Sequence, residues 1–121
     1  MLVDDEREGR SYLADYLSLL GHTVVECDSG EEALSAYQDG RYEMVLSDIN
    51  MSGMSGIELV KAINSLKREP RADIVLYTGF VDGSLSTAAL RAGAYEYLTK
   101  PINMEKLKAI LKHVEEHQAR L

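Results

Sequence analysis

The sequence lacks several features that mark other classes of protein. Cys27 is its single cysteine, so no disulfide can form within the chain. No apolar run approaches the roughly 20 residues that a helix needs to cross a bilayer. The first three residues run straight into the acidic segment 4–6 and do not resemble a signal peptide. These absences predict a cytoplasmic protein that does not enter a membrane.

Positive charge is also scarce, since 13 Lys and Arg residues face 20 Asp and Glu residues and the formal net charge is −7. A protein that binds nucleic acid usually presents a basic face to the phosphates. We therefore expect no direct nucleic-acid binding by this chain. The acidic excess leaves room for a cation site, and the length of 121 residues fits a single domain.

Five short apolar segments alternate with patterns typical of helices. Most of the segments are rich in Val, Ile, Leu or Tyr and lack in-out alternation, as expected of strands that are covered on both faces. Regular alternation of strands and helices predicts an α/β fold with an open, doubly wound parallel sheet of five strands and five helices. The predicted strands are residues 1–3, 23–27, 44–47, 73–77 and 96–99.

The predicted helices have recognisable ends. Segments 29–32 and 55–58 each fit a capping box, in which a serine hydroxyl and a glutamate carboxylate bind free backbone N–H groups. Gly21, Gly40 and Gly93 stand where helices should stop. The fourth helix is predicted over residues 82–92.

The last helix is expected to begin at Asn103 and to pack on the sheet, although its spacing also hints at a coiled coil. His113 and His117 have a spacing that could hold zinc, but without a third ligand an exposed polar face is favoured. Cys27 is expected to be a buried, small apolar group. The residues expected to face the sheet are Leu107, Ile110, Leu111 and Val114.

The first predicted strand is short for a central strand. Only residues 1–3 precede the acidic turn. We therefore expect that residues precede Met1 in the parent protein, and that residues 1–121 are one domain of a longer chain.

Charged and polar residues follow four of the predicted strands. In an open parallel sheet the carboxyl ends of the strands form the ligand-binding edge, so these side chains should converge. Two carboxylates 4 Å apart repel by about 4 kcal/mol at an effective dielectric of 20. A hard cation with oxygen ligands, such as Mg²⁺, would relieve that repulsion. The residues concerned are Asp4, Asp5, Asp48, Thr78 and Lys100.

The same group of residues suits a phosphoryl group. Lys100 supplies a positive charge and Thr78 a neutral donor, and phosphoryl transfer depends mainly on positioning and charge neutralisation. A carboxylate in line with such a pocket can act as a nucleophile and form an aspartyl phosphate. Asp48 is the candidate.

Four motifs, in order and on the expected elements, give the chain a resemblance to the response-regulator receiver domain over its whole length. The resemblance implies the flavodoxin-like strand order 2-1-3-4-5. It also implies that Asp5, Asp48 and the backbone carbonyl of Asn50 bind Mg²⁺, with Asp4 acting directly or through water. The motifs are VDDE (3–6), DINM with GMSG (48–51 and 53–56), YTG (77–79) and AGAYEYLTKP (92–101).

The resemblance further implies that Asp48 takes a phosphoryl group from a phosphohistidine of a sensor histidine kinase. Lys100 and Thr78 would bind phosphoryl oxygens, and Tyr97 would be an aromatic switch. The bond between Lys100 and Pro101 is usually cis in this family.

The implied output is a remodelled surface made by the fourth helix, the fifth strand and the fifth helix. An output domain or effector protein would sense this surface, and a homodimer could form through it. The domain would catalyse only its own phosphorylation and slow dephosphorylation, with Phe80 shielding the phosphoryl group from water. The sequence departs from the family pattern at Ser52, Ser55 and Ile102, where proline, aspartate and phenylalanine are frequent.

Two other functions fit part of the sequence. A Mg²⁺-dependent phosphatase with an aspartyl-phosphate intermediate is suggested by the segment 48–50, but Asn50 cannot serve as its proton donor. A nucleotide- or flavin-binding module would need glycines in the first turn, where the acidic segment 4–6 would instead repel a pyrophosphate.

Overall fold

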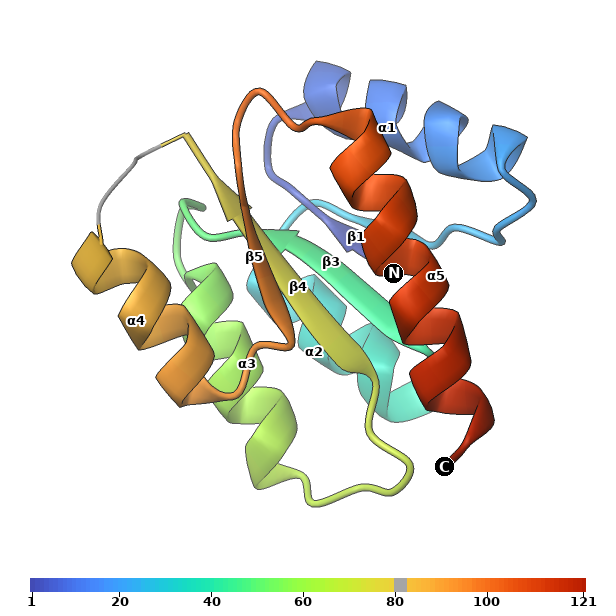
Figure 1. The fold of residues 1–121 in the computed structure, drawn as a ribbon. Helices are drawn as coiled ribbons and strands as arrows, with labels where there is room; N and C mark the ends of the chain where they lie inside the picture. The colour runs from blue at the N-terminus through green and yellow to red at the C-terminus, as the bar shows by residue number, and fades with distance from the viewer. Residues whose placement is uncertain (80–82) are drawn as a thin grey trace.

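Five parallel strands form one sheet in the order β2-β1-β3-β4-β5, as expected (Figure 1). The structure is a computed structural model that describes residues 1–79 and 83–121. The prediction for Phe80 therefore lies outside the described residues. The strands are β1 (Leu2–Val3), β2 (Glu26–Cys27), β3 (Met44–Asp48), β4 (Asp73–Thr78) and β5 (Glu96–Thr99).

Helices cover both faces of the sheet, with α1 and α5 on one face and α2, α3 and α4 on the other (Figure 1). This arrangement confirms the predicted doubly wound α/β fold. Among the described residues, no helix is both long and apolar enough to span a membrane. The helices are α1 (Arg7–Leu19), α2 (Gly30–Asp39), α3 (Gly56–Ser65), α4 (Gly83–Ala92) and α5 (Met104–Ala119).

Three strand predictions differ from the structure in an informative way. The strand predicted over 23–27 pairs only at Glu26 and Cys27, because its single neighbour is the two-residue strand β1. In contrast, β3 and β4 each run one residue further than predicted, to Asp48 and Thr78. These two polar residues are therefore fixed by the sheet itself.

Side chains alternate between the two faces along each strand. Leu2, Leu46 and Leu98 pack with α1 and α5. Their neighbours Val3 and Val45 pack with α2 and α3 on the opposite face. The alternation assigns a face to each residue at the strand ends.

The capping predictions are confirmed in one helix and half confirmed in another. At α3, Ser55 accepts from the Glu58 N–H and Glu58 accepts from the Ser55 N–H, which completes the box. At α2 the Ser29 hydroxyl accepts from the Glu32 N–H. The reciprocal half of the box is not formed at α2, and the neighbouring Asp28 raises the pKa of Glu32.

Helix α5 begins after Asn103, whose side chain caps it, and buries the four predicted apolar residues on the sheet. His113 is exposed, as expected. His117 is only partly exposed: its Nδ1 lies 2.7 Å from Oδ2 of Asp73, and its ring stacks on Tyr95. The His117 side chain remains 42% exposed and borders the buried carboxylate of Asp73 at the start of β4. Cys27 is buried, as predicted, and burial raises its pKa to about 11.

Candidate functional site

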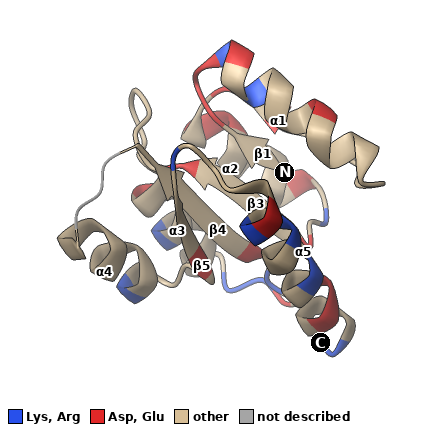
Figure 2. Cartoon of the chain, turned by 45° about the horizontal axis from the view of Figure 1, so that its top comes forward, with Lys and Arg blue, Asp and Glu red and all other residues tan. Residues whose placement is uncertain are grey.

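The carboxyl ends of β1, β3, β4 and β5 meet at one edge of the sheet, and the predicted residues lie there. Figure 2 shows acidic segments at the turn between β1 and α1 and a basic segment just after β5. Alternation along the strands puts Asp4, Asp48 and Lys100 on the α1/α5 face, with Leu2, Leu46 and Leu98. Thr78 falls on the opposite face.

Asp48 ends β3 and pairs with Lys100. The Lys100 Nζ lies 2.8 Å from Oδ2 of Asp48. Asp48 itself is only 5% exposed. The other oxygen, Oδ1, accepts from the backbone N–H of Asn50 at 2.9 Å. The Asp48 carboxylate is therefore held at a fixed position by one charged and one neutral donor.

Asp4 is equally buried and reaches the same lysine. Its Oδ2 accepts from the Tyr77 hydroxyl at 2.7 Å and lies 3.9 Å from the Lys100 Nζ. Its Oδ1 accepts from the backbone N–H of Glu6 at 2.9 Å. Lys100 thus lies between two buried carboxylates, and its Nζ is 5.2 Å from the centre of the Tyr77 ring.

These contacts set the protonation of the site. Partial burial acts to lower the pKa of Lys100, but the hydrogen bond and charge of Asp48 and the charge of Asp4 outweigh it, so the pKa is raised. Burial, followed by the bond to Asp4, raises the pKa of Tyr77 far above its ordinary value. At neutral pH Lys100 is a cation and Tyr77 is a hydrogen-bond donor.

Asp5 lies at the exposed rim of the site. Its Oδ2 accepts from the backbone N–H of Ser52 at 3.0 Å and so ties the first turn to the loop after β3. In the part of the chain that the structure describes, no three Asp, Glu, His or Cys side chains form a metal-binding group. The carboxylates of Asp4 and Asp48 are gathered around Lys100, whereas Asp5 faces Ser52.

Thr78 is fully buried at the end of β4, and the side chain of Asn50 reaches it. The Asn50 Nδ2 donates to the Thr78 Oγ1 at 2.7 Å. This bond links the loop after Asp48 to the opposite face of the sheet. Tyr97, on β5, packs against the core cluster on that same face.

Gly56 allows the loop after β3 to close on Asp48. Its N–H donates to the carbonyl of Ile49 at 2.9 Å. A Cβ at this position would lie 2.4 Å from the backbone oxygen of Asp48, closer than any side-chain carbon can approach. The bond between Lys100 and Pro101 is cis, in agreement with the resemblance.

Three contacts were missed by the sequence analysis: the Tyr77 hydroxyl on Asp4, the Asn50 amide on Thr78, and the close approach at Gly56. Strand alternation could have found the first, because Tyr77 and Asp4 both fall on the α1/α5 face. The other two depend on the path of the loop over residues 49–55, for which the sequence offers no comparable periodicity.

Comparison with known proteins decides the family. The sequence model of the response regulator receiver domain matches residues 1–112. The chain belongs to the response regulator receiver domain family. The predicted resemblance and fold are thereby confirmed.

Relatives share this domain within longer proteins. The chain is 37% identical over 117 residues to the response regulator protein FleR of Pseudomonas aeruginosa, covering 97% of this chain and 24% of FleR. It is 34% identical over 115 residues to the C4-dicarboxylate transport transcriptional regulatory protein DctD of Rhizobium meliloti, covering 95% of this chain and 25% of DctD. The chain spans about a quarter of the length of these curated relatives.

Solved structures agree with the fold. The chemotaxis protein CheY4 of Vibrio cholerae superposes with a TM-score of 0.86 at 31% identity, over 93% of this chain and 94% of CheY4. The match extends over nearly the whole of both chains, as the sheet order and helix arrangement predict. The phosphatase alternative is not favoured by any of these comparisons.

Proposed function

We propose that this receiver domain is a phosphoacceptor switch in which Asp48 accepts a phosphoryl group from a sensor histidine kinase. The observation that carries the proposal is the ion pair of 2.8 Å between Lys100 and Asp48, at the carboxyl end of the central strand β3. The pair places a buried nucleophile beside a cation that can move to a phosphoryl oxygen. Family membership supports the same role.

The donor set at this edge fits Mg²⁺. Asp4, Asp5, Asp48 and the backbone carbonyl of Asn50 offer hard oxygen ligands, the type that Mg²⁺ prefers. Three carboxylates against the one ammonium of Lys100 leave an excess of two negative charges, which a divalent cation balances. A bound Mg²⁺ would neutralise charge on the incoming phosphoryl group.

The protein's own groups carry the transfer. An Asp48 carboxylate oxygen forms the new bond to phosphorus, while the bond from phosphorus to the donor imidazole nitrogen breaks and its electron pair stays on that nitrogen. The Lys100 ammonium shifts from the Asp48 carboxylate to a phosphoryl oxygen. The Thr78 hydroxyl donates to another phosphoryl oxygen.

The new charge then acts on the opposite face of the sheet. Phosphorylation adds about −1.5 to −2 charge at Asp48. Movement of Thr78 towards the phosphoryl group would change its contact with Asn50 and the space beside Tyr97. A new Tyr97 rotamer would alter the surface formed by α4, β5 and α5. An output domain, an effector protein or a second copy would respond to the shifted population. The relative DctD, a transcriptional regulatory protein, supports an output domain that acts in transcription.

The test uses acetyl phosphate with and without MgCl₂. Intact-protein mass spectrometry should show a gain of one phosphoryl group that requires Mg²⁺, and Asp48→Asn should abolish it. Asp39→Asn, at the exposed end of α2, is the matched control and should keep full labelling. Equal labelling of Asp48→Asn would disprove the assignment. Sustained release of phosphate from an added phosphoester would instead support the phosphatase alternative.

A further inference from the structure

Asp5 differs from the other two carboxylates of the site in how it is held. Both oxygens of Asp4 and both oxygens of Asp48 accept hydrogen bonds from protein groups. Asp5 is exposed, and only its Oδ2 has a partner among the residues that the structure describes, the backbone N–H of Ser52 at 3.0 Å. Of the six carboxylate oxygens on these three residues, Oδ1 of Asp5 is therefore the one left for a ligand.

The loop that contains Ser52 is anchored on both sides of this residue. Before it, the Asn50 N–H donates to the carboxylate at the end of β3 at 2.9 Å. After it, Gly53 turns the chain with a φ of +74°, a conformation that glycine adopts without strain. The next N–H, that of Met54, donates to Oε2 of Glu31 on α2 at 3.3 Å. The donor that reaches Asp5 thus belongs to a fixed segment of backbone.

The position of this segment makes the contact relevant to a cation. Asn50, whose backbone carbonyl is a proposed Mg²⁺ ligand, lies two residues before Ser52. One short segment therefore supplies both a ligand and the donor to Asp5. Carboxylates that bind metal ions are in turn hydrogen-bonded by protein groups, which fix their orientation. Without such a bond, an exposed carboxylate must lose its side-chain freedom when it binds the ion.

We propose that the backbone N–H of Ser52 is a positioning group for Mg²⁺ binding, which holds Oδ2 of Asp5 and leaves Oδ1 for the cation. Any residue except proline can supply this N–H. Proline is frequent at this position in the family pattern, so the contact depends on the departure at Ser52. The inference rests on the proposed function, because it takes Asp5 and Asn50 as Mg²⁺ ligands.

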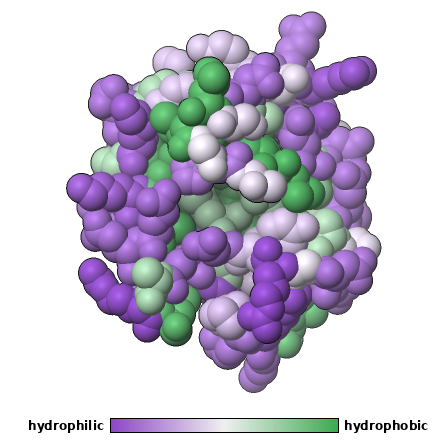
Figure 3. Space-filling model, turned by 90° about the vertical axis from the view of Figure 1, so that its right-hand side faces the viewer, coloured by the Kyte–Doolittle hydropathy of each residue, from purple (hydrophilic) through white to green (hydrophobic). Residues whose placement is uncertain are grey.

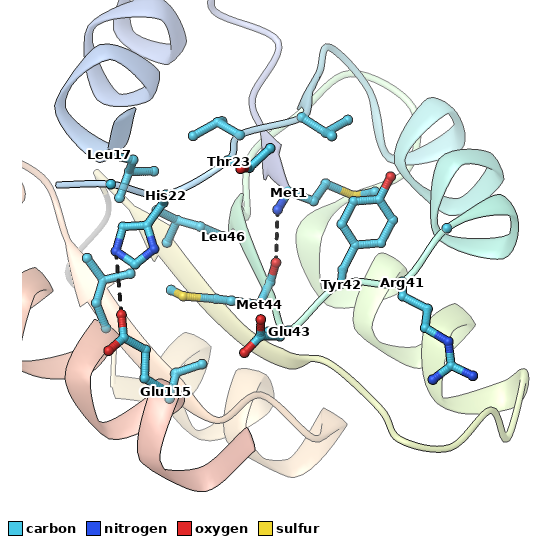
Figure 4. Close-up of a pocket in the computed structure, with 16 residues that line it drawn as sticks. Met1, Leu17, His22, Thr23, Arg41, Tyr42, Glu43, Met44, Leu46 and Glu115 are labelled. Atoms are coloured by element: carbon cyan, nitrogen blue, oxygen red, sulfur yellow. Dashed lines mark hydrogen bonds and ion pairs between the residues drawn. The ribbon is translucent and has the colours of Figure 1, made fainter. Parts of the chain in front are cut away.

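A carboxylate at the opposite edge of the sheet provides a control for charge. A groove of about 720 Å³ opens there, at the amino ends of the central strands (Figure 4). Figure 3, which views the right-hand side of Figure 1, shows apolar atoms around a hollow on that face. Glu43 borders the groove and is exposed. Glu43→Gln therefore removes one negative charge from the chain without touching the edge that carries Asp5.

The test measures the dissociation constant for Mg²⁺ by NMR titration with MgCl₂, without a phosphoryl donor. Ser52→Pro removes the N–H, and so does an ester in place of the amide between Met51 and Ser52, which adds no ring. We expect both changes to weaken Mg²⁺ binding by roughly tenfold, the lower end of the effect of losing a group that orients a metal ligand, because Asp5 is exposed. Ser52→Ala keeps the N–H and should bind Mg²⁺ like the native chain, as should Glu43→Gln.

A second measurement follows the hydrogen bond itself in the native chain. Exchange of the Ser52 amide proton with water, measured by NMR, should stay as slow or become slower when MgCl₂ is added. The reason is that the Asp5 carboxylate keeps its donor while it binds the cation. Faster exchange in MgCl₂ would overturn the proposal, because it would mean that Ser52 and the cation compete for Asp5.

Native affinity in the ester variant would also overturn the proposal, whatever the result for Ser52→Pro, because the ester removes the donor without restricting the backbone. Equal weakening by Ser52→Ala would do the same. At saturating MgCl₂, labelling of Asp48 by acetyl phosphate should be native in every variant. Failure of the native chain to label would contradict the proposed function, whereas native labelling with unchanged affinity in the ester variant would remove only the positioning role.

Discussion

Lys100 lies 2.8 Å from Asp48 and 3.9 Å from Asp4, whose carboxylates are almost fully buried. Replacing it by methionine leaves two neighbouring buried charges without their cation. Removing one partner of a buried ion pair costs about 3–5 kcal/mol. Because the Lys100 side chain is 36% exposed, solvent screening reduces the expected loss of unfolding free energy to about 1–3 kcal/mol at pH 7.

Urea unfolding without Mg²⁺ measures this loss for Lys100→Met. Lys108→Met, on the exposed face of α5, is the control and should stay within about 0.5 kcal/mol of the native chain. If the two variants are equally stable, the two carboxylates do not depend on Lys100 for their charge balance.

Besides Lys100, the Tyr77 hydroxyl also stabilises the buried carboxylate of Asp4. Since its bond of 2.7 Å is buried, Tyr77→Phe should lower the unfolding free energy by about 1–2 kcal/mol at pH 7. The pKa of Tyr77 is raised above 10.0 and that of Lys100 above 10.5, so the folded state keeps both protons longer than the unfolded state. Their stabilisation is complete below pH 10 and is lost as the pH rises further.

Stability measured by denaturant unfolding from pH 8 to 11.5 should therefore fall less steeply in Tyr77→Phe than in the native chain. A residual slope from Lys100 remains in the variant. Tyr12→Phe, at a position that is 69% exposed, should reproduce the native slope. An unchanged slope in Tyr77→Phe would show that the hydroxyl does not couple to Asp4.

At the residue scale, the sequence predicted which side chains lie at the carboxyl edge of the sheet. It did not predict which of them form ion pairs and hydrogen bonds with one another. The positions of Asp4, Asp48 and Lys100 follow from the parallel strands that carry them. The rim position of Asp5 does not, because it depends on which backbone N–H of the following loop lies within reach, here that of Ser52.

Among the elements, α3 controls the loop that carries Asn50. Its first residue, Gly56, would bring a Cβ within 2.4 Å of the Asp48 carbonyl oxygen. We expect Gly56→Ala to lower the unfolding free energy by about 1–3 kcal/mol, as overpacking usually does. It should also slow labelling of Asp48 by acetyl phosphate, because the backbone of the acceptor itself must shift.

Gly83→Ala is the matched control, since a Cβ at the first residue of α4 meets nothing within 4 Å. It should leave stability and labelling close to native values. Thermal unfolding and a labelling time course measure both effects. Native behaviour of Gly56→Ala would mean that the loop can yield to the added methyl group without displacing Asp48.

The two capping motifs show why local patterns predict elements better than their details. Ser29 and Ser55 stand in the same motif, yet only Ser55 forms the complete box. Asp28 precedes Ser29 and lies near enough to Glu32 to raise the pKa of that carboxyl. The residue before Ser55 is Met54, which offers no such partner. Both helix starts were predictable, whereas the environment of the Glu32 carboxyl depends on a neighbour outside the motif.

For the whole molecule, the two edges of the sheet differ in chemistry. The carboxyl edge gathers buried charges that balance one another around Lys100. The amino edge has an apolar groove beside β1, with the amino group of Met1 buried in it. Strand order and helix sides were predictable from the alternation of elements. The groove was not predicted, because its size depends on how α1, α5 and the two flanking segments pack.

The buried amino group makes the stability of the whole chain depend on pH near neutrality. Its pKa is 8.0 in the unfolded state and about 6 in the folded state, so between these values the unfolded state binds a proton that the folded state does not. Stability is therefore highest above pH 8 and falls towards pH 6, by up to about 2–3 kcal/mol. Acetylation of Met1 removes the titrating amino group and so abolishes this loss. Denaturant unfolding of the free and acetylated chains from pH 5.5 to 8.5 should thus give curves of unfolding free energy against pH that diverge as the pH falls. Parallel curves would show that water reaches the amino group in the folded state.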